Sequence, residues 1–392
     1  MSPFRSLPSV TTKRALAAVL TTVVVAIVLC GAFLAALHVS PSRAHAASTS
    51  QSGTTFASSS TTPLLQFPEG ITSWDNKVYV ATYNVNAPTS SRIFIFNVSN
   101  GQLLRTIGGQ PGQQLVSANV LLGLTINPST GDLFVAANGA GEILRIQNPV
   151  INANPQISVY ATYPSGGGPE DLAFFKDGTL FASDSNLGAV YSIPPGGGTV
   201  NTVIPSSNPL TTSPVAGLSP NGIVFSQDWH TLYVANTYSD SITAFSVNDA
   251  GQLTDSGKLF AQNLNDNLEE YPTGFDALVL PDTKIGAGAS TPLNGPDGLA
   301  LDSKGRIWVA SNLGDNLTVL DPATGKVVTT FGTSAVTQNG SLNQPAGMTF
   351  VGNTVFCTNL GIFTGLAGTP NIPFSVVSFN AGVSGAGGNG NW

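Results

Sequence analysis

The chain contains 392 residues, of which 43 are glycine and 26 are proline, and only 9% are charged. So many helix-breaking residues exclude a mainly helical enzyme, and 14 basic residues against 21 acids, a net charge of −7, exclude a nucleic-acid binder. Of the three histidines only His230 lies beyond residue 46, which excludes a histidine-rich zinc site.

Residues 1–46 form the first predicted element, an export signal. The first 14 residues carry three basic residues and no acid, residues 15–37 are mostly apolar, and Ala-His-Ala at 44–46 has the small-x-small pattern of a cleavage site. Because the apolar run is long enough to cross a bilayer, an uncleaved N-terminal membrane anchor is the alternative. Both readings predict an extracytoplasmic protein, either secreted or anchored by this segment.

A short signature then recurs six times within residues 63–380. In most copies a polar residue precedes a glycine and an isoleucine or leucine, and an apolar strand, a turn and a second strand follow. The six copies begin at Pro68, Leu121, Pro169, Pro220, Pro296 and Pro345. They are 48 to 53 residues apart, except for one interval of 76. Each unit continues with a third strand and most with a fourth, and four strands in about 50 residues make a propeller blade. The sequence therefore predicts an all-β, six-bladed β-propeller with four-stranded blades.

The last repeat ends near Phe379 after three strands, so its fourth strand is missing. Residues 53–57, within a Ser/Thr-rich linker at 47–62, are similar to the fourth strands of the other repeats. We expect this N-terminal strand to pair with the last blade and close the ring, which removes an exposed sheet edge. A Gly-rich tail follows at 381–392.

The interval of 76 residues contains an insertion of about 25 residues at roughly 263–292. Connections between blades begin at the end of the molecule where the signatures start, so the insertion could cover that end of the channel as a lid. A solvated loop without a role is the alternative.

The second residue of each signature is the most informative position for function. In a propeller the first strand of each blade lines the central channel, so these six residues should surround one mouth of the channel. Three of them are acids, one is an amide and two are apolar. In chain order they are Glu69, Leu122, Glu170, Asn221, Asp297 and Ala346.

Carboxylates that meet in a narrow mouth repel one another, so they raise each other's pKa values or require a cation. Oxygen donors without histidine or cysteine suit a hard ion, most of all Ca²⁺, and predict a metal site formed by Glu69, Glu170, Asn221 and Asp297. Asp171 lies beside this site, but strand alternation should turn its side chain away from Glu170. The alternative is a set of ordinary polar turns around a water-filled channel, because Pro-Asn-Gly and Pro-Asp-Gly are common turn sequences.

These signatures resemble the gluconolactonase/regucalcin (senescence marker protein) family of six-bladed propellers, most of all in residues 220–236 and 295–310. The resemblance implies a divalent metal on the channel axis, with Glu69, Asn221 and Asp297 at the family's ligand positions. Glu170 stands where the family has an asparagine, which adds a negative charge. The family hydrolyses lactones or related esters, so the resemblance implies a small lactone or ester substrate and makes Asp297 the catalytic base or nucleophile. The runner-up is a non-catalytic propeller of the NHL type, which uses the same blade pattern to bind a ligand or a protein.

Two further sets of residues favour structural roles. His230 is expected in a solvated turn on the face opposite the mouth, too far from it for a catalytic triad. Polar residues also end the second strands near the mouth, where most should cap turns through side-chain hydrogen bonds and one or two could contact a ligand. These residues are Asn138, Asp184, Asn236, Asn312 and Asn359.

Overall fold

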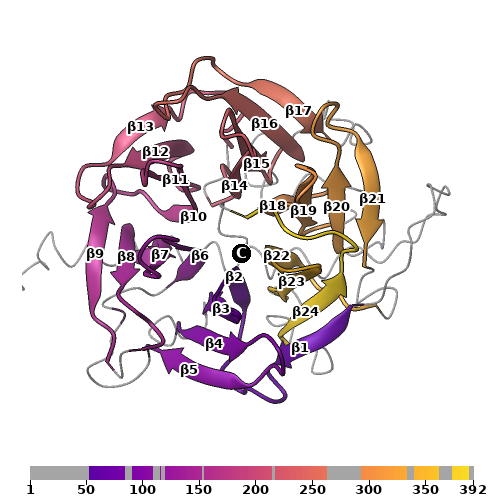
Figure 1. Ribbon diagram of the computed structural model, residues 1–392. Helices are drawn as coiled ribbons and strands as arrows, with labels where there is room; N and C mark the ends of the chain where they lie inside the picture. The colour runs from indigo at the N-terminus through magenta and orange to yellow at the C-terminus, as the bar shows by residue number, and fades with distance from the viewer. Residues whose placement is uncertain are drawn as a thin grey trace, which may run out of the picture.

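The computed structural model describes residues 53–83, 91–108, 115, 120–151, 154–213, 217–262, 293–332, 340–361 and 373–387. Within these ranges the chain forms six four-stranded antiparallel sheets arranged around a central axis, as Figure 1 shows. The predicted six-bladed β-propeller is therefore confirmed. The leader 1–46 and the insertion 263–292 lie outside the described residues. In the described part of the chain, no helix has the length and apolar character needed to cross a bilayer.

Blades 1 to 3 each consist of four consecutive strands. Their strands are β2 (Pro68–Trp74), β3 (Lys77–Thr82), β4 (Ile93–Asn97), β5 (Leu103–Ile107); β6 (Leu121–Ile126), β7 (Leu133–Ala137), β8 (Glu142–Ile146), β9 (Ile157–Thr162); and β10 (Pro169–Phe174), β11 (Leu180–Asp184), β12 (Ala189–Ile193), β13 (Asn201–Ile204). A short 3₁₀ helix, η3 (Asn138–Ala140), follows β7.

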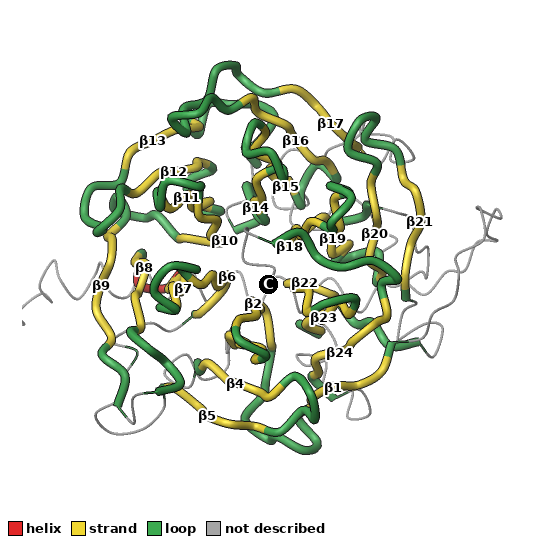
Figure 2. The backbone as a smooth tube through the Cα atoms, in the orientation of Figure 1, coloured by secondary structure: helices red, strands yellow, loops and turns green. Residues whose placement is uncertain are grey.

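Blades 4 and 5 repeat this arrangement, and blade 6 takes its outer strand from the N-terminus. Their strands are β14 (Ile223–Phe225), β15 (Thr231–Asn236), β16 (Ser241–Ser246), β17 (Lys258–Gln262); β18 (Pro296–Leu301), β19 (Ile307–Ser311), β20 (Asn316–Leu320), β21 (Val327–Phe331); and β22 (Pro345–Val351), β23 (Thr354–Asn359), β24 (Ser375–Asn380) with β1 (Thr54–Ser58). In Figure 2 the first strands surround the axis and the outer strands form the rim.

The core lies between the blades. Each of the six interfaces between neighbouring blades is filled by its own cluster of buried apolar side chains in the described part of the chain. The second strands are buried along their whole length, as in Leu133–Ala137, because a neighbouring blade covers each face. The outer strands are exposed at their first residues, as in Leu103–Ile107. This is why the second strands have apolar residues on both faces, such as Leu-Phe-Val-Ala-Ala at 133–137.

The N-terminal strand closes the ring as predicted. Strand β1 pairs antiparallel with β24, with Thr54 opposite Ser378 and Ser58 opposite Ser375. The ring of Phe56 contacts Phe356 in blade 6 at 4.9 Å and Phe96 in blade 1 at 6.0 Å between centroids, both edge to face. The closing strand therefore links the last blade to the first through side chains as well as through backbone hydrogen bonds.

The first part of the glycine-rich tail packs against blade 5. The amide of Ala386 donates to the Leu301 carbonyl at 3.0 Å, and the amide of Ser303 donates to the Ser384 carbonyl at 2.7 Å. Ala386 is buried beside the blade 4 and blade 5 core. Residues 381–387 thus add to the propeller rather than extending away from it.

Candidate functional site

The four polar residues predicted at the mouth come from four different blades and are all buried. Glu69, Glu170, Asn221 and Asp297 are each 7% exposed. The two apolar members of the ring, Leu122 and Ala346, are 4% and 0% exposed. Glu69 and Glu170 are close enough to each other and to Asp297 for the charges to interact. Their shared position in the repeated signature therefore brings the predicted residues into one region of the molecule.

A β-bulge at the start of the first strand aims these side chains. In five blades the register with the second strand shifts between the first and the fourth signature residue, for example between Pro68 and Ile71 and between Pro169 and Leu172. A bulge breaks the two-residue alternation of side chains. The second and third signature residues can then both face the channel, which a regular strand would not allow.

Glycine at the third signature position makes the ring tight. A Cβ built on Gly70 would lie 2.0 Å from the carbonyl oxygen of Leu122 in the next blade, and one on Gly222 would lie 2.2 Å from that of Asp297. The same clash with the neighbouring blade recurs at Gly123, Gly298 and Gly347, at 2.6, 2.6 and 2.7 Å. The inner strands thus pack backbone against backbone, which only a residue without a side chain allows.

A small cavity of about 50 Å³ lies within this ring. Its polar lining includes Glu69, Asn221 and Asp297, together with Asp171. Such a volume holds an ion or one or two waters, not an organic molecule. Glu170 is not among the lining residues, because its carboxylate accepts a hydrogen bond from the Ser185 hydroxyl at 2.5 Å.

Three of the four mouth residues are held by a hydroxyl or amide from the end of the neighbouring second strand. Besides the contact between Ser185 and Glu170, the Asn221 amide donates to the Thr237 hydroxyl at 3.0 Å, and the Asn312 amide donates to Asp297 Oδ2 at 3.0 Å. Thr237 donates in turn to the Pro296 carbonyl at 2.7 Å. These side chains hold the mouth residues in place, and Thr237 and Asn312 also tie their blades to the next one.

The sequence reasoning missed Ser185 and Thr237 and did not predict the contact between Asn312 and Asp297. The signal that could have found them is the spacing. Each lies 15 or 16 residues after its partner, one residue beyond the end of the second strand. At the same point, Asn138 donates to the Pro169 carbonyl at 3.2 Å. Asn236 caps a turn as predicted, since it accepts from the Ser239 amide, whereas Asn359 accepts from the amide of Asn343 and so holds the segment that precedes β22.

Glu69 is the exception among the mouth residues. Its Oε2 is buried and has no hydrogen-bond partner within the described ranges. Its neighbours on the ring are the apolar residues Leu122 and Ala346, so they offer no donor. A buried carboxylate oxygen without a partner is costly, because it has lost its solvation without gaining a replacement.

Burial dominates the electrostatics of the site. It raises the pKa values of Glu69 and Glu170 well above the ordinary value, and the neighbouring carboxylates raise them further. The pKa of Asp297 rises to about 7, from burial and from the charge of Asp171, despite the hydrogen bonds from Asn312 and Asn221. Burial also raises the pKa of Asp171 to about 6. Without a cation, ionisation of these carboxyl groups is therefore less favourable than ionisation of ordinary exposed ones.

The sequence predicted that the Asp171 side chain turns away from Glu170, and of these two residues only Asp171 lines the cavity. Asp171 lines the same cavity as Glu69, Asn221 and Asp297, because the bulge in β10 interrupts the alternation at this position. Its Oδ2 accepts from the amide of Ile223 in the next blade at 3.0 Å.

No three acidic, histidine or cysteine side chains come close enough to ligate one ion directly, as far as the described residues extend. The carboxylates face one another across the mouth, but Glu170 is held at Ser185. The set of Glu69, Glu170, Asn221 and Asp297 therefore stays a prediction, as does the catalytic role of Asp297.

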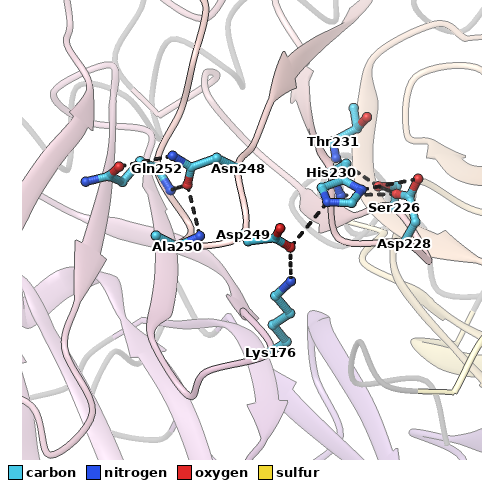
Figure 3. A network of polar contacts seen from close by, with 9 residues as sticks. All are labelled: Lys176, Ser226, Asp228, His230, Thr231, Asn248, Asp249, Ala250 and Gln252. Atoms are coloured by element: carbon cyan, nitrogen blue, oxygen red, sulfur yellow. Dashed lines mark hydrogen bonds and ion pairs between the residues drawn. The ribbon is translucent and has the colours of Figure 1, made fainter.

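His230 lies where the sequence predicted, in the turn between the first two strands of blade 4, and is 53% exposed. Figure 3 shows Asp249 between the Lys176 ammonium and the His230 ring, at 2.7 and 3.4 Å. Asp228 is also near the ring, at 3.8 Å. This exposed network joins hairpins of blades 3 and 4 and has no part in the mouth.

The fold and the site together define a class, the six-bladed propellers with polar residues on the channel axis. Residues 67–342 match the SMP-30/Gluconolactonase/LRE-like region family, and the chain belongs to this family. The membership supports a hydrolase type of function and confirms the resemblance found in the sequence. No curated protein sequence matches the chain significantly.

Several solved structures share the fold. A calcium-binding protein, regucalcin, from Agrobacterium tumefaciens is 14% identical, with a TM-score of 0.58 over 88% of this chain and 98% of that one. XC5397, a gluconolactonase from Xanthomonas campestris, is 18% identical, with a TM-score of 0.51 over 88% and 100%. A luciferin-regenerating enzyme is 14% identical, with a TM-score of 0.55 over 81% and 92%. At these identities the likeness extends to the fold alone.

Proposed function

We propose that this protein is an exported, divalent-metal-dependent hydrolase that opens a small lactone or ester at the mouth of its channel. The observation that carries the proposal is the unpartnered, buried Oε2 of Glu69. The Glu69 carboxyl group lies within electrostatic range of Asp297 and Glu170, and it shares the small cavity with Asn221 and Asp297. A cation is the partner that would satisfy this oxygen and neutralise its neighbours.

The donor set fits a hard cation. Glu69, Glu170, Asn221 and Asp297 offer carboxylate and amide oxygens only, which is the chemistry that Ca²⁺ prefers. Glu170 would have to leave the Ser185 hydroxyl to join the other three. Thr237 and Asn312, which hold Asn221 and Asp297, orient these donors as outer ligand partners do in metal sites. Regucalcin of Agrobacterium tumefaciens, which has the same fold, is a calcium-binding protein.

A cation bound there would supply a Lewis acid that polarises the carbonyl of a lactone or ester. Asp297 is the residue placed to act as the base. The Asn312 amide fixes its Oδ2, and in its ionised form the carboxylate could take a proton from the attacking water.

The test combines metal binding with activity. We expect calorimetry to detect Ca²⁺ binding to the wild-type chain, and a screen of lactones and esters with Ca²⁺, Mg²⁺, Mn²⁺ and Zn²⁺ to detect turnover. Asp297→Asn, which keeps an acceptor for Asn312, should lower turnover by about 10² to 10⁴-fold without unfolding the protein. Asp321→Asn, in an exposed turn, is the matched control and should have no effect. Full turnover by Asp297→Asn would reject the assignment.

The second candidate is an exported, non-catalytic propeller that binds a ligand or a protein, as NHL-type propellers do. The observation that favours it is the absence of a ready-made cluster of three ligating side chains among the described residues. A blank screen with all four metals, together with the absence of Ca²⁺ binding, would favour this candidate.

A further inference from the structure

One junction of the inner ring differs from the other five. At five junctions the third signature residue is a glycine whose missing side chain lets it touch the carbonyl of the next blade. Between blades 3 and 4 the residue at this position is Asp171. Since a Cβ has no room at the other five junctions, the backbones must stand further apart here. A side chain takes the place of the direct backbone contact.

The Asp171 side chain spans this wider junction. Its Oδ2 accepts from the Ile223 amide of blade 4 at 3.0 Å, and the backbone amide of Asp171 donates to Ser183 Oγ of its own blade at 2.9 Å. On the other side, a Cβ on Gly123 of blade 2 would lie only 2.6 Å from Asp171 Oδ1. Asp171 is thus held between the first strands of blades 2 and 4 and has little freedom to move.

The blade that receives this bond is also the one with the shortest first strand among those described. Strand β14 contains only Ile223–Phe225, whereas the other first strands have six or seven residues and start at the signature. Asn221 therefore precedes the strand. The backbone N–H of Asn221 donates to the Ala235 carbonyl of its own blade at 3.0 Å. The bond from Ile223 to Asp171 fixes the backbone two residues further along.

We propose that Asp171 is a positioning residue of the mouth, which fixes the start of β14 through the Ile223 amide and thereby places Asn221 in the ring. The inference rests on the proposed function in that Asn221 is taken as a ligand of the cation. An aspartate suits this role because its short side chain reaches the amide and its carboxylate makes a charge-assisted hydrogen bond. The glycine found at the other junctions would leave the Ile223 amide without this acceptor.

Two variants separate positioning from direct ligation. Asp171→Asn keeps an acceptor for the Ile223 amide but removes the charge, and Asp171→Gly restores the residue of the other five junctions and removes the acceptor. Asp177→Gly, an exposed turn residue at the far end of the same hairpin, is the control for the substitution itself.

The first measurement is amide hydrogen exchange over residues 221–225 in the metal-free proteins. We expect exchange to rise about tenfold or more in Asp171→Gly and to stay within about threefold of wild type in Asp171→Asn and in the control. Unchanged exchange in Asp171→Gly would overturn the proposal. This comparison decides the role of Asp171 even if the wild-type protein binds no Ca²⁺, in which case only the proposed function fails.

The second measurement is the affinity for Ca²⁺ by calorimetry. We expect Asp171→Gly to bind about 10 to 100-fold more weakly and Asp171→Asn to stay within about threefold of wild type. An equal loss in both variants would mean that the charge matters rather than the position, which would overturn the proposal. So would an undiminished affinity in Asp171→Gly.

Discussion

At the scale of single residues, the mouth depends on glycines, whose lack of a Cβ atom leaves room for the neighbouring blade. Glycine at the third signature position lets five of the six first strands approach the next blade until backbone meets backbone, and this brings the second signature residues together around the axis. The contact is least tolerant at Gly70, where a Cβ would lie 2.0 Å from a carbonyl oxygen that cannot rotate away. The glycines thus determine the diameter of the ring that the carboxylates occupy.

We therefore expect Gly70→Ala to lower the free energy of unfolding by about 3 kcal/mol or more, because the new methyl group must push two blades apart. The measurement is the urea midpoint at a fixed protein concentration. Gly387→Ala is the control, since a Cβ there would meet nothing within 4 Å. Equal midpoints for the two variants would contradict this account of the ring.

At the scale of elements, the repeated signature was enough to predict the blades, their order and the closing strand. These features depend on the length of the strands and on their alternation of residues, which a single sequence shows. The signature also placed Glu69, Glu170, Asn221 and Asp297 at one mouth. It could not predict where Asp171 points, because the bulge that turns this residue toward the channel changes the register between two strands and leaves no mark in a single sequence. The partners Ser185 and Asn312 depend on the same local geometry.

The closing strand gives a second prediction. Phe56→Ala removes the ring that packs on Phe96 of blade 1 and Phe356 of blade 6. Because Phe56 is only partly buried, we expect a loss of about 2 kcal/mol, below the range for a fully buried phenylalanine. Thr55→Ala, one residue earlier on an exposed position, should change the urea midpoint little.

If β1 detaches in the Phe56→Ala variant, the edge of β24 becomes available to other chains. Light scattering on heating should therefore rise earlier in Phe56→Ala than in Thr55→Ala. Identical scattering and identical midpoints in the two variants would mean that the ring does not depend on this strand for closure.

At the scale of the whole molecule, the site concentrates negative charge on the axis of a protein that is already acidic. Burial raises the pKa values of Glu69, Glu170, Asp171 and Asp297 together. Elsewhere, hydrogen bonds and nearby positive charges lower the pKa values of surface aspartates such as Asp249 and Asp321. The axial carboxyl groups and the surface aspartates therefore change the free energy of unfolding in opposite directions as the pH rises, and they do so in different ranges of pH.

The direction of the pH dependence of stability follows from proton binding. Between the ordinary carboxyl pKa, near 4, and the raised values of about 6 for Asp171 and about 7 for Asp297, the folded protein binds more protons than the unfolded chain. The free energy of unfolding therefore falls as the pH rises through this window. The surface aspartates with lowered pKa values contribute stability that is lost only below pH 4, outside the window.

In chelator we thus expect the melting temperature to fall by several degrees between pH 5 and pH 7.5. Ca²⁺ needs the deprotonated carboxylates, so it should stabilise the protein more at pH 7.5 than at pH 5 and reverse the trend. The measurement is calorimetric melting at both pH values, with EDTA or with Ca²⁺. Glu69→Gln should flatten the dependence in EDTA and weaken the response to Ca²⁺, whereas the surface variant Asp321→Asn should do neither. A wild-type melting temperature that rises from pH 5 to pH 7.5 in EDTA would show that the axial carboxyl groups do not have raised pKa values in the folded protein.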